Sequence, residues 1–189
     1  MVNYEKHQKI AFISRVLAMM IAVACFLIPL CPAITMKSGD VKKTYGSCYS
    51  FIFGGKINST NISYSSKGIS GLALAGFIVI VVASLLLIAS FFIHDRVVKK
   101  PVVIFCCAIT FIVGAIIFAS LHKSISNMLA DALINGHSDT VSTTVYNNTN
   151  MEFGSWGVSL FVFVTSFLLL ASLLFDGTFD KVRAKIGLN

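Results

Sequence analysis

Charged residues are scarce in this chain. They make up 12% of its 189 residues, whereas 56% are hydrophobic and the mean hydropathy is +0.84. A soluble globular domain carries roughly 25% charged residues, so this composition excludes one and indicates a membrane protein. Acidic residues are the scarcer kind, eight against fifteen basic ones, which gives a net charge of +7. The basic residues are scattered rather than gathered in one stripe, which argues against a nucleic-acid partner.

Four long stretches lack charge altogether. They cover residues 16–36, 68–93, 101–121 and 153–175. Each reaches the ~20 residues that a helix needs to cross the hydrocarbon core of a bilayer, and lipid offers the backbone no hydrogen-bond partner outside a helix or a closed barrel. We therefore expect membrane lipids as partners and an all-α membrane protein with a single domain over 1–189. It should be a bundle of four transmembrane helices at about 12–36, 68–93, 101–121 and 154–175.

Proline is also rare, and two of the three prolines fall near the end of the first stretch. Pro29 and Pro32 each lack a backbone donor and disfavour helical geometry in the residue before them. A kink or an early end of the first helix is expected there.

Groups that could carry chemistry are few. The four stretches contain no charged residue, and Arg15 lies at the end of the first, where it can extend to lipid head groups. One loop holds several potential metal ligands without a recognised ligand spacing, so we interpret them as solvated loop residues: His122, Asp131, His137, Asp139 and Glu152. No Ser–His–Asp order, phosphate loop or close carboxylate pair stands out. We predict no enzyme, no catalytic residues, no cofactor and no metal.

The positive charges predict the orientation. The segments before, between and after the helices alternate sides, and Lys and Arg divide nine to six between the two sides. The nine occupy short segments, whose charge controls insertion, and three of them fall in the seven-residue turn 94–100. Both termini should be cytoplasmic in a cell-membrane protein, with the loops 37–67 and 122–153 outside.

The outer loops contain a single cysteine. Cys48 therefore has no partner within the loops, and a disulfide to Cys31 at the end of the first helix is possible if the first loop folds back. Three triplets fit the N-glycosylation pattern, starting at Asn58, Asn61 and Asn147.

The loops predict a small extracellular cap of short strands plus one amphipathic helix. Two aromatic and β-branched runs flank Gly54-Gly55, which is a hairpin signal. In the second loop, apolar residues from Ile125 to Leu133 recur on one helical face, and Thr140–Tyr146 is rich in strand formers. Alternatively, the helix merely extends the third span above the membrane.

A row of aromatics suggests a function for the first loop. Tyr45, Tyr49, Phe51 and Phe53 alternate, so in a single strand all four would project to one face. That face is either an exposed interaction surface or the lid of a small core formed with Met128, Leu129 and Leu133.

The layout resembles that of claudins and tetraspanins in topology, but their motifs are missing, because the first loop has no Trp and the second has no cysteine. Phe53-Gly54-Gly55-Lys56, together with Gly-Leu-Ala-Leu-Ala-Gly at 71–76, is similar to small uncharacterised four-pass membrane proteins of Gram-positive bacteria and their wall-less relatives. This resemblance implies no known activity.

The features together predict a non-enzymatic scaffold, interaction or accessory subunit of a cell-surface membrane complex, which binds other membrane proteins or itself through its loops. The alternative is a channel or transporter subunit whose path forms between protomers.

Overall fold

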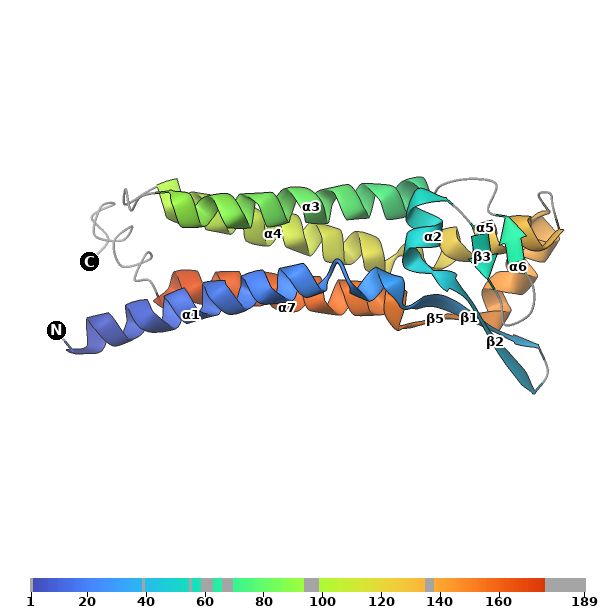
Figure 1. The fold of residues 1–189 in the computed structure, drawn as a ribbon, viewed down its shortest axis with the longest axis horizontal. Coiled ribbons are helices and arrows are strands. Elements are labelled where there is room, and N and C mark those ends of the chain that lie inside the picture. The colour runs from blue at the N-terminus through green and yellow to red at the C-terminus, as the bar shows by residue number, and fades with distance from the viewer. Residues whose placement is uncertain are drawn as a thin grey trace.

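Four long apolar helices run alongside one another through most of the molecule (Figure 1). The computed structural model describes residues 2–38, 40–54, 56–58, 63–65, 70–93, 99–134 and 138–175. The long helices are α1 (Val2–Ala24), α3 (Gly71–Phe92), α4 (Lys99–Ala119) and α7 (Phe153–Phe175). A helix of about 22 residues rises about 33 Å, which matches the hydrocarbon core of a bilayer. All four belong to segments that are long and apolar enough to span, so the protein is an integral multi-pass membrane protein.

The bundle is held together by close packing around α7, which contacts both α1 and α4, while α3 packs on α4. Ser159 Oγ donates to the carbonyl of Ala115 at 2.7 Å, and Ser166 Oγ donates to that of Ala108 at 2.9 Å. Such bonds across a helix interface satisfy hydroxyls that lipid could not. At Gly76 of α3, an added Cβ would lie 2.7 Å from Ile117 of α4, so these two helices approach closely.

Arg15 is buried in the bundle. Its exposed fraction is 7%, and its Nε donates to Ser172 Oγ of α7 at 3.5 Å. The expectation that this side chain extends to lipid head groups is therefore wrong, because α1 begins well before Arg15 and turns it toward α7.

The first span ends early, as its prolines predict. α1 stops at Ala24, a short 3-10 helix η1 (Ile28–Leu30) follows, and strand β1 (Pro32–Ser38) begins at the second proline. The predicted helix over 12–36 therefore extends too far. The residues after Ala24 form η1 and then enter the sheet through β1.

The remaining elements form a cap at one end of the bundle, whereas α1 begins and α7 ends at the opposite end (Figure 1). We use the word cap for the described parts of residues 32–70 and 121–152. Strand β1 pairs with β2 (Val41–Ser47) on one side and with β5 (Thr149–Met151) on the other, both antiparallel. A separate pair joins β3 (Lys56–Asn58) and β4 (Ser63–Ser65). Because β5 precedes α7, the three-stranded sheet unites the two loops.

Three helices complete the cap: α2 (Cys48–Phe53), α5 (Leu121–Ile134) and α6 (Asp139–Asn148). The sequence correctly predicts α5, which starts two residues after α4 ends. Two finer predictions are wrong. The run before Gly54 is helical, so the tight hairpin is β1–β2 instead, and Thr140–Tyr146 lies in α6 rather than in a strand.

Candidate functional site

The predicted aromatic row does not lie on one strand. Tyr45 belongs to β2, whereas Tyr49, Phe51 and Phe53 belong to α2. Tyr45 is 3% exposed and Phe51 is fully buried, in the same hydrophobic cluster as Leu129. The prediction of a single strand with one aromatic face is therefore wrong, because the chain turns into a helix after β2. Whether any of the four contacts a partner stays a prediction.

Tyr49 and Phe53 instead join an aromatic cluster where the cap meets the bundle. Both rings contact Phe77 of α3 edge-on, with centroids 5.8 Å and 5.3 Å away, and Phe26 contacts Phe77 at 5.9 Å. The Tyr49 hydroxyl donates to the backbone carbonyl of Phe26. Burial raises the pKa of this phenol, and the neighbouring Cys48 raises it further. The cluster fastens α2 to the ends of two spans.

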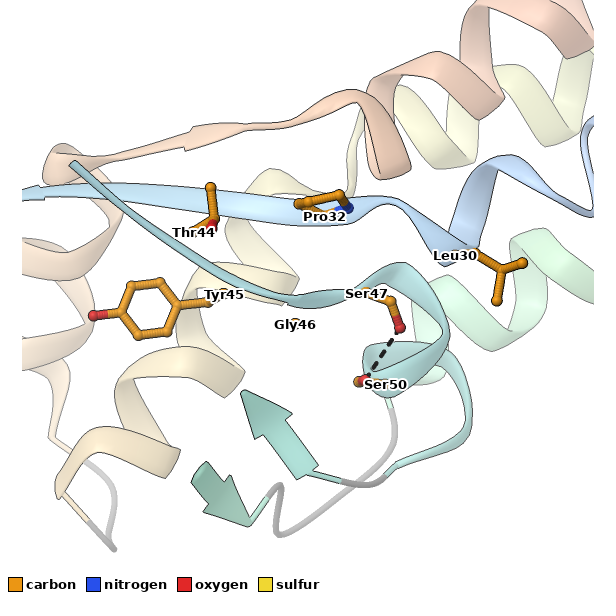
Figure 2. A pocket seen from close by; sticks show the side chains of 7 residues that line it. All are labelled: Leu30, Pro32, Thr44, Tyr45, Gly46, Ser47 and Ser50. Atoms are coloured by element: carbon orange, nitrogen blue, oxygen red, sulfur yellow. Dashed lines mark hydrogen bonds between the residues drawn. The ribbon is translucent and has the colours of Figure 1, made fainter. Parts of the chain in front are cut away.

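A cavity of about 300 Å³ lies between the β1–β2 hairpin and α2 (Figure 2). Its lining combines the end of the first span with the second half of β2 and the start of α2: Leu30, Pro32, Thr44, Tyr45, Gly46, Ser47 and Ser50. Ser47 and Ser50 share a hydrogen bond of 3.2 Å at its rim. Gly46 has a φ of 51°, a left-handed conformation that side chains disfavour. The second half of β2, including the backbone of Gly46, therefore borders the cavity.

β2 is also the edge of its sheet. Within the described residues its strand neighbour is β1, and the strand order is β2-β1-β5. Lysines at 37, 42 and 43 are exposed around the hairpin, against one aspartate, Asp40, so its tip carries a net charge of +2. The exposed end of the hairpin is polar and basic, and charged side chains, lysine above all, are one means by which natural sheet edges avoid uncontrolled pairing.

Glu152 fixes the hairpin to the start of α7. Thr35 Oγ1 donates to Glu152 Oε1, and Lys42 Nζ lies 3.1 Å from the same oxygen. The bond from Thr35, and next the charge and hydrogen bond of Lys42, lower the pKa of this carboxyl despite some desolvation. The Glu152 backbone N–H donates to the carbonyl of Ala33 at 2.9 Å. The loop between the first two spans is thus attached to the last span at several points.

The other predicted positions are spread through the cap. Cys31 and Cys48 are free thiols in the structure, and burial raises the pKa of Cys48 to about 11, partly offset by a hydrogen bond with Ser155. Asn147 is exposed on α6, Asn58 lies in β3, and Asn61 lies outside the described residues. The disulfide and the glycosylation sites stay predictions.

His122 and Glu152, which belong to the set of potential ligands in the second loop, have structural partners. His122 Nε2 lies 3.1 Å from the carbonyl of Thr149 and its ring contacts Tyr146, while Glu152 binds Thr35 and Lys42. His137 lies outside the described residues. Among those described, no three His, Cys, Asp or Glu side chains converge on a possible metal position.

A polar seam in the cap was missed by sequence reasoning. Thr149 Oγ1 lies 3.2 Å from His122 Nε2 and 3.0 Å from Ser126 Oγ, which links α5 to β5. The available signal was the spacing of His122 and Ser126, which are four residues apart on one helical face. Nothing local points to their partner, 23 residues or more along the chain.

Neither known family models nor curated proteins match this sequence. The resemblance to small four-pass proteins of Gram-positive bacteria and their wall-less relatives therefore stays a prediction.

Proposed function

We propose that this protein is a non-enzymatic accessory or interaction subunit of a cell-surface membrane complex, and that its cap binds a partner along the edge of β2 that, within the described residues, is not hydrogen-bonded to another strand. One observation carries the proposal: a seven-residue edge strand borders an open cavity. An extended segment added to such an edge gains backbone hydrogen bonds, and a neighbouring pocket receives its side chains.

The charge of the hairpin selects the partner. Lys37 and Lys43 are exposed on neighbouring strands, and Lys42 is 60% exposed although it pairs with Glu152. Opposite charges across an interface speed association and exclude wrong partners. The partner we propose is another membrane protein that presents an extended acidic segment.

Affinity isolation of the full-length tagged protein in a mild detergent tests this proposal. We expect a stoichiometric partner, and we expect Lys43→Glu to abolish its recovery while leaving the folded yield intact. Lys9→Glu is the matched control, because Lys9 is exposed on α1 at the opposite end of the bundle. A monodisperse monomer without a partner, or equal recovery with Lys43→Glu, contradicts the proposal. A homo-oligomer sensitive to Lys43→Glu would identify a second copy of the chain as the partner.

The proposal requires the cap to face outward, with both termini cytoplasmic in the cell membrane. Its support is the Lys and Arg distribution around the short segments. An impermeant maleimide should label Thr144→Cys, which is exposed on α6, from outside intact cells, and Lys9→Cys only after permeabilisation. Labelling of both from outside would overturn this orientation.

Arg15, which is buried between α1 and α7, is the observation behind the second candidate, a channel or transporter subunit. An ionisable side chain among membrane helices is costly and often marks a transport path. Flux through reconstituted vesicles that is lost with Arg15→Gln would support this function, whereas vesicles sealed to ions and small solutes would argue against it.

A further inference from the structure

Two of the free cysteines lie opposite each other at the base of the β1–β2 hairpin. The strand register pairs Pro32 with Ser47, so Cys31 and Cys48 occupy the next pair of positions. Cys31 has an extended backbone, with φ −71° and ψ 161°, and continues the line of β1. Opposite residues in an antiparallel pair have Cα atoms about 4.5–5.5 Å apart, and disulfides span about 4.4–6.8 Å. The hairpin therefore brings these two backbone positions within the reach of a bond.

The two cysteines also share a face of the hairpin. Side chains alternate between faces along a strand, so Cys31 lies on the same face as Thr35. The Thr35 hydroxyl donates to Glu152, just before α7, and so identifies this as the face that meets α7. Cys48 lies on this face too, because its thiol has a hydrogen bond with Ser155 of α7. Register and alternation together place the two thiols side by side.

The two thiols differ in their access to solution. Cys48 is fully buried, and burial raises the pKa of its thiol to about 11. Cys31, which follows η1, is partly exposed. Buried thiols are inert toward external reagents, whereas a neighbouring thiol held in place reacts as though it were highly concentrated. A reagent from solution can therefore reach Cys31 first, and Cys48 is placed to react second.

We propose that Cys31 and Cys48 form a reversible disulfide by exchange with a disulfide donor, such as oxidised glutathione or an oxidised thiol oxidoreductase. The Cys31 thiolate attacks one sulfur of the donor, which breaks the S–S bond of the donor and releases one donor thiolate. The Cys48 thiolate then attacks the Cys31 sulfur of this mixed disulfide, which forms the new bond and releases the second donor thiolate. The two donor thiolates take up the two protons that the cysteines lose, so the donor is reduced and the pair is oxidised. The structure shows the reduced state.

The bond closes the hairpin into a ring, because it joins the residue before β1 to the first residue of α2. A bond of this kind limits the conformations that the enclosed chain can reach when it unfolds. α2 already contacts Phe77 of α3 through Tyr49 and Phe53, so the ring is attached at the junction of cap and bundle. In the purified protein the reaction needs neither a partner at β2 nor a particular orientation in the membrane. The inference therefore stands apart from the proposed function.

A redox titration of the full chain in phosphatidylcholine nanodiscs tests the inference. The protein is reduced, equilibrated with mixtures of oxidised and reduced glutathione, quenched with acid, alkylated and cleaved with trypsin. Cleavage after Lys37 and Lys43 puts Cys31 and Cys48 on separate peptides. Cys25 shares the first of these peptides, so Cys25→Ala serves as the parent chain, and the natural chain should give the same result. We expect mass spectrometry to find the two peptides linked through Cys31 and Cys48, and to find them separate after reduction.

Two variants of the parent chain test the order of exchange. Cys48→Ser should stop the reaction at a mixed disulfide between Cys31 and glutathione. Cys31→Ser should leave Cys48 as a free thiol, modified at least tenfold less than Cys31 is in the first variant, because the donor does not reach a buried thiol. Thermal unfolding under reducing conditions checks that both variants fold, and Cys48→Ala replaces Cys48→Ser if the serine disturbs the buried site.

Three results for the parent chain would overturn the inference. These are glutathione on both cysteines without a link between them, two thiols that stay free at every glutathione ratio, and a link between the Cys31 residues of two copies. Modification of Cys48 in folded Cys31→Ser would overturn the order of exchange.

Discussion

The bundle and the cap obtain their stability from different forces. In the bundle, lipid is as apolar as the helix interiors, so burial supplies little drive and close packing with internal hydrogen bonds must suffice. Small residues such as Ala18, Ala83 and Ala108 are accordingly buried at its contacts. The cap lies beyond the apolar spans and buries large side chains such as Phe51, Ile34 and Leu129, which is the pattern of a hydrophobic core formed in water.

Besides the aromatic cluster around Phe77, the two regions meet at a crowded point where the start of α7 crosses the start of β1. Ser155 Oγ and the Glu152 N–H both donate to the carbonyl of Ala33, each at 2.9 Å. Gly154 lies between these two donors and leaves no room for a side chain. We therefore expect a side chain added inside this junction to cost most, a truncation in the cap core to cost less, and changes in charge or thiol chemistry to cost least.

The largest effect is expected for Gly154→Ala. A Cβ there would overlap the carbonyl oxygen of Cys31 and would lie 2.6 Å from that of Pro32, and these backbone atoms cannot move aside at low cost. We expect a loss of about 5 kcal/mol or more in the free energy of unfolding and a low yield of monodisperse protein. Gly71→Ala is the matched control, because nothing lies within 4 Å of its Cβ position. Equal thermal stability of the two variants would show that the junction is not rigid.

The next prediction separates the cap core from its edge. Phe51→Ser should lower the free energy of unfolding by about 3–5 kcal/mol, because it empties a fully buried site. Phe53 is 53% exposed and mainly contacts aromatic rings, so Phe53→Ser should cost only about 1 kcal/mol. Thermal unfolding of both variants and isolation of the partner are the measurements. Normal stability and normal partner recovery in both would leave the aromatic residues without a role.

The same contrast explains which parts of the fold the sequence could predict. Spans follow from the length of uncharged runs, and α5 follows from Ile125, Leu129 and Ala132 on one face. α6 was misassigned because β-branched residues favour strands, but Val141 and Val145, four apart, both pack toward the core. In the cap, tertiary contacts override the strand propensity of single residues. No long uncharged run identifies the elements there, as it does for the spans.

The candidate site was harder to predict because it depends on distant pairing. β1 meets β5 through Ile34 and Met151, more than a hundred residues apart, and no local pattern specifies that contact. The basic hairpin and its lysines were visible in the sequence, but the free edge of β2 was not. The alternation from Tyr45 to Phe53 was misleading, since Cys48, Phe51 and Ile52 are the residues buried on one side of α2.

A smaller effect should follow from Glu152, which joins the hairpin to α7. Its pKa is lower in the folded protein than the ordinary value of 4.5, so its contribution is present above that value and is lost as pH falls through the folded-state pKa. Glu152→Gln should cost about 1 kcal/mol at neutral pH and reduce the loss of stability on acidification. Thermal unfolding from neutral pH to about pH 3 measures this. Lys42→Met should have a weaker effect, because the bond from Thr35 is the larger cause; an equal or larger effect would reverse that order.

The smallest effect on the fold, and a sensitive probe of cap integrity, is expected at Cys48. Burial raises the pKa of its thiol to about 11, from an ordinary value of 9.0. The thiolate is the reactive form and the side chain is fully buried, so maleimide labelling of Cys48 in the native protein near pH 8 should be slower than in the denatured protein by about 100-fold or more. Ser155→Ala removes the hydrogen bond that lowers this pKa and should slow labelling further if the cap remains folded, whereas faster labelling would indicate that the bond closes the junction. Mass spectrometry of labelled peptides with and without prior reduction also tests the predicted disulfide. Label on Cys31 and Cys48 that is found only after reduction would establish the bond and would contradict the free thiols seen here.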